Sequence, residues 1–179
     1  MTPDPTPAQF YDDLAADYHL IFADWDAAIA WEADIIAALL RDRGVTAGPV
    51  LDASCGIGTQ AIGLARAGFA VTATDISPAS VERCAREAAA RGLTLTTAVA
   101  DLRTLDVAGG GSFAAAGGTL RRALRPSGLL LASIRDYDAA LRERPSGDPP
   151  RRYPTEDGER IVFQGGTGCP RIATPSVTS

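Results

Sequence analysis

The sequence has no lysine and almost no histidine, and these absences exclude several kinds of active site. All seventeen basic residues are arginine, and His19 is the single histidine. A P-loop lysine, a Schiff-base lysine and a Ser/Lys dyad are excluded, because each needs a lysine side chain. A Ser/His/Asp triad is hard to assemble, because it would have to use His19. The remaining candidates are sites built from carboxylates, hydroxyls and backbone groups.

The chain has few cysteines, and they are far apart. Cys55, Cys84 and Cys169 form no CxxC pair, whereas zinc sites typically combine such pairs with histidine. We therefore expect no metal site. We expect the three cysteines to be reduced and to behave as small apolar residues.

Long apolar runs and a strong excess of positive charge are also missing. No run approaches the ~20 residues of a membrane span, and the first ten residues resemble no signal peptide. The net charge of −5 argues against nucleic acid or an anionic membrane as the main partner. A length of 179 residues suits one domain with one core. We therefore expect a cytoplasmic protein with a small-molecule substrate, no nucleic acid partner and no membrane partner.

Strand and helix patterns alternate along the first hundred residues. Apolar residues recur at helical spacing over residues 7–22 and 25–42. Buried-strand patterns follow at PVLDAS, FAVTATD and LTLTTAVAD, with a helical pattern after each of the first two. Such βαβ units predict an α/β fold with a doubly wound, Rossmann-like parallel sheet covered by helices on both faces.

The last third of the chain has a weaker pattern. We expect a buried strand at LLLASI, after a turn at PSG. Further on, proline, glycine, serine and charge dominate, and RIVF is the one remaining candidate strand. The sequence thus predicts an N-terminal helical lid at 1–44, an α/β ligand-binding core at 45–144 and an irregular C-terminal tail at 145–179.

The stretch LDASCGIGTQAIGLA, residues 51–65, puts a glycine-rich turn between a strand and a helix. Gly56 and Gly58, with Ala61, fit the dinucleotide-binding pattern. Such a turn brings backbone N–H groups and the positive end of a helix dipole close to a ligand. By itself, however, the pattern also suits a tight turn that binds nothing.

An acidic residue closes each of the three predicted strands, as Asp52, Asp75 and Asp101. The C-terminal ends of parallel strands meet at one edge of the sheet, where open α/β folds bind their ligands. Asp75 follows Gly56 by nineteen residues, a position from which a carboxylate accepts hydrogen bonds from ribose hydroxyls. The three acids together favour a ligand site at this edge.

From about Tyr11 to Asp138, the sequence resembles the class I S-adenosylmethionine-dependent methyltransferases. The words that carry the resemblance are LDASCGIGTQAIGLA, TATDISPASVERCAREAAARGL, VADLRTL and LRPSGLLLASIRDYD. The branch most similar to them is that of the glycine and sarcosine N-methyltransferases. The resemblance implies S-adenosyl-L-methionine as cofactor and methyl transfer to a small-molecule acceptor, with amines such as glycine or sarcosine as candidates.

The same resemblance implies roles for individual residues. The implied cofactor-binding residues are Tyr11, Asp52, Ser54, Gly56, Gly58, Asp75, Ile76, Asp101 and Leu102. Residues 52–58 would line the methionine part, Asp75 the ribose, and Asp101 with Leu102 the adenine. The segment FYDDLAADYHLIF would cover the site. Within it, Tyr18 and His19 are the catalytic candidates, because either could take or orient the proton of an amine acceptor.

The sequence departs from this family between Asp101 and LRPSG. About twenty residues stand there, with almost no bulky apolar residue besides Phe113. A buried fourth strand cannot form from such a segment, and the C-terminal stretch after RIVFQ lacks strand alternation. We therefore expect an incomplete sheet, without the fourth strand and the C-terminal antiparallel pair, and self-association through exposed sheet edges.

Two other interpretations stay open at the level of sequence. One is an NAD-binding oxidoreductase, because the turn fits the dinucleotide pattern; yet about fifty residues precede the first strand, where such domains usually begin. The other is a catalytically inactive remnant that merely binds the cofactor or a partner. The shortened segment after Asp101 favours that second alternative.

Overall fold

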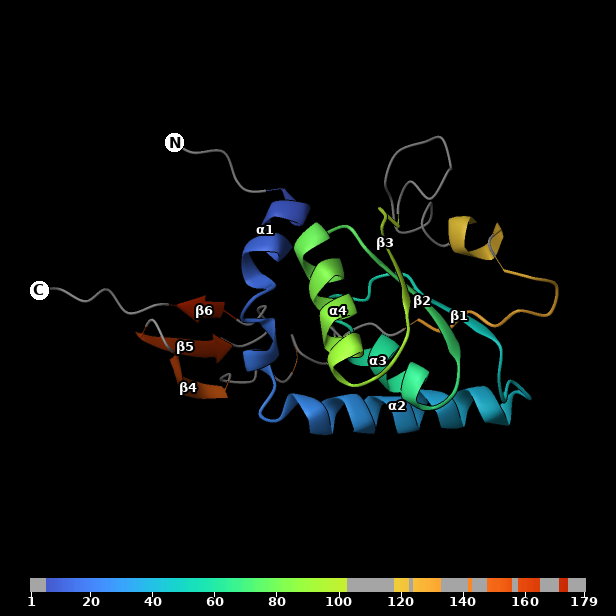
Figure 1. Cartoon of the computed structure of the whole chain (residues 1–179), viewed down its shortest axis with the longest axis horizontal. Helices are drawn as coiled ribbons and strands as arrows, with labels where there is room; N and C mark the ends of the chain where they lie inside the picture. The colour runs from blue at the N-terminus through green and yellow to red at the C-terminus, as the bar shows by residue number, and fades with distance from the viewer. Residues whose placement is uncertain are drawn as a thin grey trace, which may run out of the picture. The chain divides into compact units, whose positions relative to one another are not determined.

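The computed structural model describes residues 6–102, 118–122, 124–132, 142, 148–155, 158–164 and 171–173. The chain divides into two compact units (Figure 1). The first, called the α/β unit, comprises Met1–Tyr18 and Asp24–Leu130, and the second, called the antiparallel unit, comprises His19–Ala23 and Leu131–Ser179. The residues implied in cofactor binding all belong to the α/β unit, whereas His19 belongs to the antiparallel unit.

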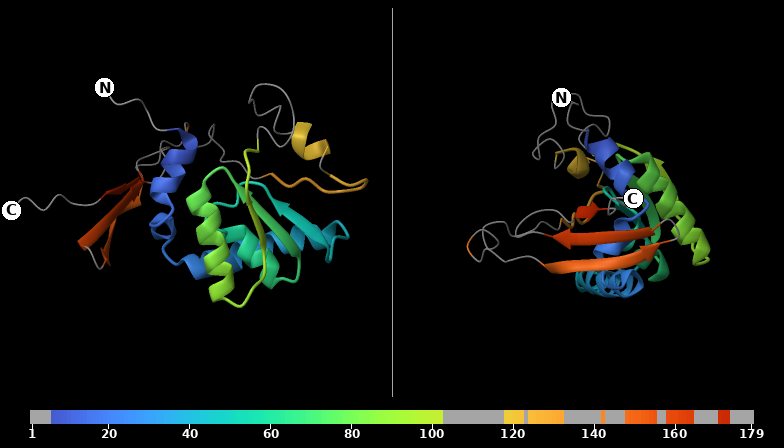
Figure 2. Two further views of the ribbon diagram at one scale, coloured as in Figure 1. Left: turned by 45° about the horizontal axis from the view of Figure 1, so that its top comes forward. Right: turned by 90° about the vertical axis from the view of Figure 1, so that its left-hand side faces the viewer.

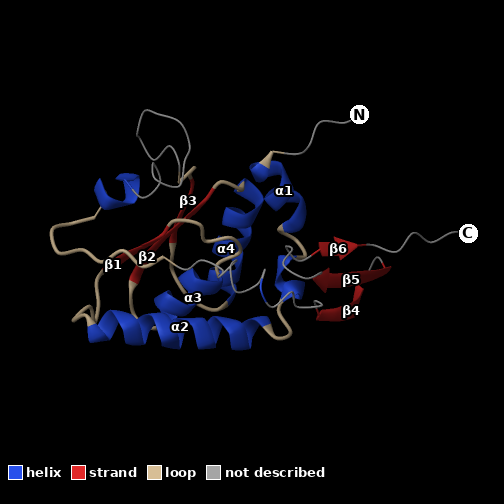
Figure 3. Cartoon of the chain, turned by 180° about the vertical axis from the view of Figure 1, so that it is seen from behind, coloured by secondary structure: helices blue, strands red, loops and turns tan. Residues whose placement is uncertain are grey.

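A parallel sheet of three strands forms the centre of the α/β unit (Figure 3). The strands are β1 (Pro49–Asp52), β2 (Ala70–Asp75) and β3 (Thr96–Val99), in the order β1-β2-β3. Their register pairs Asp52 with Ala73 and Asp75 with Val99, so the strand ends lie at one edge of the sheet. The three strands predicted in this part of the chain and the α/β class are confirmed.

Three helices pack against one face of this sheet. They are α2 (Trp25–Asp42), α3 (Thr59–Arg66) and α4 (Pro78–Ala90). Their shared core with β2 consists of Ala37, Leu40, Cys55, Ala61, Leu64, Phe69, Val71, Ala73 and Cys84. Leu51 alternates to the opposite face and is 42% exposed. These helices therefore do not provide the predicted cover on both faces.

The helix boundaries follow from local capping chemistry. Ser77 is the N-cap of α4, and its side chain accepts a hydrogen bond from the Ser80 N–H at 3.0 Å, as a serine followed by proline predicts. The N-terminal segment begins with α1 (Pro7–Leu14), which starts in a capping box of Thr6 and Gln9. A short 3-10 helix, η1 (Tyr18–Ile21), follows it. Residues 118–122 are also helical.

The strand predicted at LLLASI is wrong for the residues that the structure describes. Residues 129–132 have no regular secondary structure, and the side chains of Leu129, Leu130 and Leu131 are 37–48% exposed. The rest of this predicted strand lies outside the described residues. A buried parallel strand needs neighbouring strands and covered faces, and the sequence between Asp101 and LRPSG, where the preceding strand is expected, has few bulky apolar residues. The described leucines pair with no strand of the parallel sheet, although β1 is an edge strand there.

The antiparallel unit corrects the prediction of an irregular C-terminal tail. It contains β4 (Asp148–Thr155), β5 (Gly158–Gln164) and β6 (Arg171–Ala173), in the order β4-β5-β6. The strands β4 and β5 run antiparallel side by side (Figure 2). β5 contains the predicted strand RIVF, and β4 tolerates its prolines because it is an edge strand. C-terminal antiparallel strands are therefore present, but in a sheet of their own.

Candidate functional site

The glycine-rich turn connects β1 to α3 at the edge of the parallel sheet. Gly56 and Gly58 have positive φ angles of 52° and 99°, in the region that favours glycine. The Gly58 N–H donates to the Cys55 carbonyl at 2.8 Å, and the Cys55 N–H donates to the Thr74 carbonyl at 2.9 Å. The turn is thus closed on itself and attached to β2.

The two glycines face different surroundings. A Cβ atom on Gly58 would lie 2.7 Å from the Cys84 Sγ atom of α4, which is sterically forbidden. A Cβ atom on Gly56 would meet nothing within 4 Å. Gly58 therefore serves the packing of α3 on α4, whereas Gly56 presents its backbone to open space.

Asp75 joins the glycine-rich turn to the start of α4. Its Oδ2 atom accepts a hydrogen bond from the Gly56 N–H at 2.9 Å, and its Oδ1 atom accepts one from the Ser77 N–H at 3.0 Å. Hydrogen bonds to an ionised carboxylate are stronger than those between neutral groups. Asp75 therefore fixes the position of both turns while it lines the cavity described below.

Asp52 is partly buried at the end of β1, next to the same turn. Its Oδ2 atom is buried and has no hydrogen-bond partner in the described part of the chain. Burial raises the pKa of Asp52 to about 6; a hydrogen bond from the Ser54 backbone opposes this shift, and the charge of Asp75 adds to it. A buried carboxylate oxygen without a partner is costly. The Asp52 Oδ2 atom is therefore a buried acceptor near the cavity but not on its wall.

A cavity of about 410 Å³ opens at this edge of the sheet. Its lining residues are Pro7, Tyr11, Tyr18, Ala53, Ser54, Gly56, Asp75, Ile76, Ser80, Ala100, Asp101 and Leu102. The predicted site residues Tyr11, Tyr18, Ser54, Gly56, Asp75, Ile76, Asp101 and Leu102 are among them. The structure therefore gathers the ends of β1, β2 and β3 and the N-terminal segment around one space.

Three predicted site residues do not line this cavity. Asp52 lies next to the turn, Gly58 faces Cys84, and His19 lies on η1 beside Tyr18. Conversely, Pro7 and Ser80 line the cavity and were missed. Ser80 lies in the first turn of α4, and its place after Asp75 in the SPAS sequence is a signal that could have indicated it.

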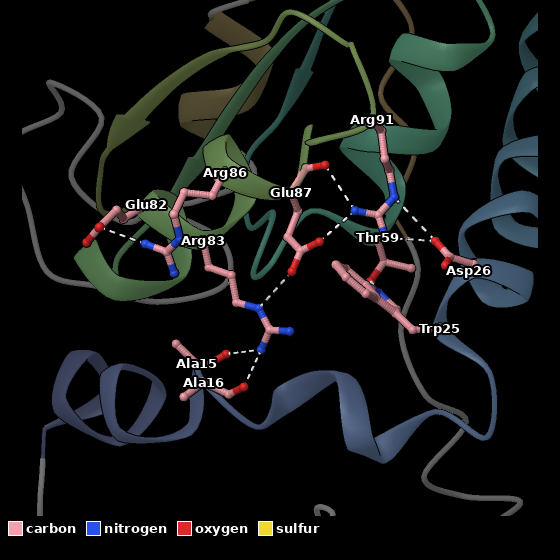
Figure 4. A network of polar contacts seen from close by, with 10 residues as sticks. All are labelled: Ala15, Ala16, Trp25, Asp26, Thr59, Glu82, Arg83, Arg86, Glu87 and Arg91. Carbon is pink, nitrogen blue, oxygen red and sulfur yellow. Dashed lines mark hydrogen bonds and ion pairs between the residues drawn. The ribbon is translucent and has the colours of Figure 1, made fainter. Parts of the chain in front are cut away.

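A network of aromatic and charged side chains connects α2, α3 and α4 (Figure 4). The Trp25 Nε1–H at the start of α2 donates to the Thr59 Oγ1 atom at the start of α3, at 2.9 Å. The guanidinium groups of Arg83 and Arg91 lie 5.5 and 5.0 Å from the centre of the Trp25 ring, within the range of cation–π attraction. The network fixes Thr59, which directly follows Gly58.

The two described cysteines are buried in the core of the α/β unit. Cys55 and Cys84 are buried and free of disulfides, as predicted, and Cys169 lies outside the described residues. Their hydrogen bond and their burial raise the pKa of the Cys55 thiol, which keeps it protonated. Within the described ranges, no group of three or more histidine, cysteine, aspartate or glutamate side chains could hold a metal ion. Likewise, none of the described helices has the length and apolar character needed to cross a membrane.

Comparisons with known proteins point to one family. Residues 50–119 match the family of the methyltransferase domain. The glycine/sarcosine N-methyltransferase of Parasynechococcus marenigrum is 37% identical over 83 residues, which cover 46% of this chain and 29% of that relative. The chain therefore matches less than a third of the curated relative's length.

Solved structures share the fold. An S-adenosylmethionine-dependent methyltransferase from Clostridium acetobutylicum is similar with a TM-score of 0.58 and 16% identity, over 87% of this chain and 68% of that one. A protein from Methanococcus maripaludis, to which the same activity is attributed, gives a TM-score of 0.57 and 21% identity, over 72% and 64% of the two chains. Residues 50–119 therefore match a methyltransferase domain, and the described residues share the α/β fold of S-adenosylmethionine-dependent methyltransferases, with three parallel strands in the described part of the chain.

Proposed function

We propose that the cavity binds S-adenosyl-L-methionine and that the protein is a methyltransferase for a small-molecule acceptor. The observation that carries the proposal is the cavity at the carboxyl edge of β1, β2 and β3, lined by Gly56, Asp75 and Asp101 within the matched domain. Ligands of open α/β folds bind at this edge.

Two features of the described residues fit this cofactor. The open space above Gly56 allows a ligand to approach the backbone closely, and an added side chain would reduce it. The buried, unpartnered Oδ2 atom of Asp52 leaves an acceptor near the methionine side of the site. We assign residues 52–58 to the methionine part, Asp75 and Ile76 to the ribose, and Asp101 and Leu102 to the adenine.

Bound S-adenosylmethionine would supply an electrophilic methyl group on a sulfonium centre. The chain's own residues would bind and orient the cofactor and the acceptor and exclude water from them. For an in-line displacement, this is the main contribution of an enzyme. Tyr11 and Tyr18 line the cavity from the N-terminal segment. We propose that Tyr18 or the neighbouring His19 holds the proton of an amine acceptor.

For the acceptor, we propose a small amine such as glycine or sarcosine. The support for this choice is the 37% identity to a glycine/sarcosine N-methyltransferase over 46% of the chain. Tyr18 at the cavity wall fits a small polar acceptor, because its hydroxyl offers both a donor and an acceptor.

Calorimetric titration of the full chain with S-adenosylhomocysteine and, separately, with NAD tests the proposed cofactor. We expect a dissociation constant for S-adenosylhomocysteine in the micromolar to millimolar range, about 4 to 8 kcal/mol, and no heat with NAD. Binding of NAD alone would instead support the oxidoreductase. A chain with a folded circular dichroism spectrum that binds neither compound would contradict both assignments.

A further inference from the structure

The helix α1 is attached to the N-terminus of α4 through a carboxylate. The Asp12 Oδ1 atom accepts a hydrogen bond from the Ser77 hydroxyl at 2.5 Å and one from the Ala79 N–H at 3.0 Å. Ser77 is the N-cap of α4, and Ala79 is in its first turn. The first N–H groups of a helix have no partner within the helix, and a negative charge there is stabilised by the helix dipole. Asp12 therefore supplies a second cap to α4 from another element.

A second attachment runs in the opposite direction, from α4 to the end of α1. The Arg83 Nη1 group donates to the carbonyl of Ala15 at 2.5 Å and to that of Ala16 at 2.6 Å (Figure 4). These carbonyls lie where α1 ends and the chain turns toward η1. Helix carbonyls at a C-terminus have no partner within the helix, so a guanidinium group satisfies them well.

Arg83 is held in place for this contact. Its side chain is only 10% exposed, its Nε atom lies 3.4 Å from Glu87, and its guanidinium lies over the Trp25 ring. Burial lowers the pKa of Arg83, and the charge of Glu87 opposes that shift. Arg83 therefore contacts α2, its own helix and the end of α1 at once, through Trp25, Glu87 and the carbonyls of Ala15 and Ala16.

The two attachments, called the α1–α4 clamp, lie between the two tyrosines that the N-terminal segment contributes to the cavity. Tyr11 directly precedes Asp12, and Tyr18 follows Ala16 by two residues. Both tyrosines line the cavity, as does Ser80 in the first turn of α4. The helix turn that Asp12 caps is therefore itself part of the cavity wall.

We propose that Asp12 and Arg83 are positioning residues, which hold Tyr11 and Tyr18 over the ligand cavity by clamping α1 to α4. The role in ligand retention rests on the proposed function of the cavity. The clamp itself consists of contacts within the α/β unit, and it can be measured without a ligand.

Hydrogen exchange of the ligand-free full chain, followed by mass spectrometry, measures the clamp directly. In Asp12→Ala, peptides covering residues 8–18 should exchange about ten- to a hundredfold faster, because charged hydrogen bonds contribute roughly 1.5 to 3 kcal/mol. Peptides from α3 and β2 should exchange at the wild-type rate. The adjacent, exposed Asp13 provides the matched control, and Asp13→Ala should leave both regions unchanged.

Arg83→Met repeats the experiment from the other side of the clamp. Arg86 is on the same helix with a side chain that is 62% exposed, so Arg86→Met is its control. If Asp12→Ala does not fold, Asp12→Asn replaces it, since asparagine keeps an acceptor oxygen without the charge; an intermediate increase in exchange is then expected. Wild-type exchange of residues 8–18 in both Arg83→Met and the folded Asp12 variant would overturn the proposal. Equal acceleration across all peptides would also overturn it, because that result indicates global destabilisation.

Ligand retention is measured with S-adenosylhomocysteine as the probe. We expect its dissociation rate to rise about tenfold in the Asp12 variant, the change that corresponds to about 1.4 kcal/mol, and to stay unchanged in Asp13→Ala. If the wild-type chain does not bind this probe, the proposed function fails while the exchange result still decides the clamp. Faster exchange with an unchanged dissociation rate would overturn the role of the clamp in retention.

Discussion

Asp75 combines a structural contact with the predicted contact to a ligand. Because its carboxylate holds the N–H groups of Gly56 and Ser77, Asp75→Ala should loosen both turns and also remove the proposed acceptor for ribose hydroxyls. We expect S-adenosylhomocysteine to bind about ten- to a hundredfold more weakly, since a hydrogen bond to a charged group contributes roughly 1.5 to 3 kcal/mol. Calorimetric titration at fixed pH measures this change, and an unchanged affinity would contradict the ribose assignment.

The two glycines of the turn should respond differently to the same substitution. At Gly56, an added Cβ atom meets open space, so Gly56→Ala should weaken ligand binding and cost only about 1 kcal/mol of stability, from the left-handed backbone. At Gly58, the Cβ atom lies 2.7 Å from Cys84, so Gly58→Ala should lower stability by a further 1 to 3 kcal/mol, roughly the cost of overpacking. Urea unfolding and titration of both variants measure the contrast, and equal stability losses would contradict the separation of roles.

The raised pKa of Asp52 predicts a dependence of stability on pH. Its pKa of about 6 in the folded protein exceeds the ordinary value of 3.8, so the folded state holds the proton longer than the unfolded state. Stability should therefore fall as the pH rises from about 4 to about 6, by a total of about 2 to 3 kcal/mol, and then level off. Asp52→Asn should remove this slope. Urea unfolding at several pH values between 4 and 7 measures it, and a slope that persists in Asp52→Asn would assign it to other groups.

At the residue scale, sequence spacing found most of the cavity but not the direction in which each residue faces. The acids at the strand ends lie at one edge of the sheet, as the pattern indicated, because parallel strands bring their carboxyl ends together. The same holds for Ile76 and Leu102, which follow Asp75 and Asp101 in the sequence. That Gly58 packs on Cys84 depends on the approach of a helix distant in sequence. No local pattern contains that information.

At the scale of the elements, the contact of Trp25 on α2 with Thr59 on α3 should contribute to the free energy of unfolding. Trp25→Phe removes the buried hydrogen bond to Thr59 and weakens the attraction to Arg83 and Arg91. We expect a loss of about 1 to 3 kcal/mol in the free energy of unfolding. Trp31 lies on the same helix and is 66% exposed, so Trp31→Phe should change stability by less than about 0.5 kcal/mol. Urea unfolding measures both, and similar losses would contradict the role of the network.

Whole elements were predictable from sequence where capping and periodicity agree. The boundaries of α4 follow from Ser77 and Pro78, and those of β1 and β2 from short apolar runs between turns. The strand at LLLASI failed because its formation depends on a neighbouring strand, which is a property of the sheet. The strands β4 and β6 were missed because their prolines and arginines interrupt the apolar alternation that predicts a strand. Both are edge strands, and pairing with β5 stabilises them.

At the scale of the whole molecule, the described residues account for the proposed cofactor site better than for a site that holds the acceptor. The turns after β1, β2 and β3 converge on the cavity. The parallel sheet, however, has three strands in the described part of the chain, and both β1 and β3 are its edges there. We propose that such edges also favour self-association, since unpaired strand edges offer hydrogen-bonding groups to another chain.

This imbalance predicts a protein that binds S-adenosylmethionine but turns it over slowly. Holding the acceptor at attack distance can provide up to ~7 to 11 kcal/mol of barrier lowering. The sequence after Asp101 has almost no bulky apolar residue besides Phe113, so it predicts no buried fourth strand to hold acceptor-contacting residues. Full-chain protein, purified as a monomer, should therefore methylate glycine or sarcosine negligibly in a radiolabelled methyl-transfer assay at saturating cofactor. Turnover near one per second, roughly the low end for typical enzymes, would show that the residues around Tyr18 position the acceptor without a fourth strand.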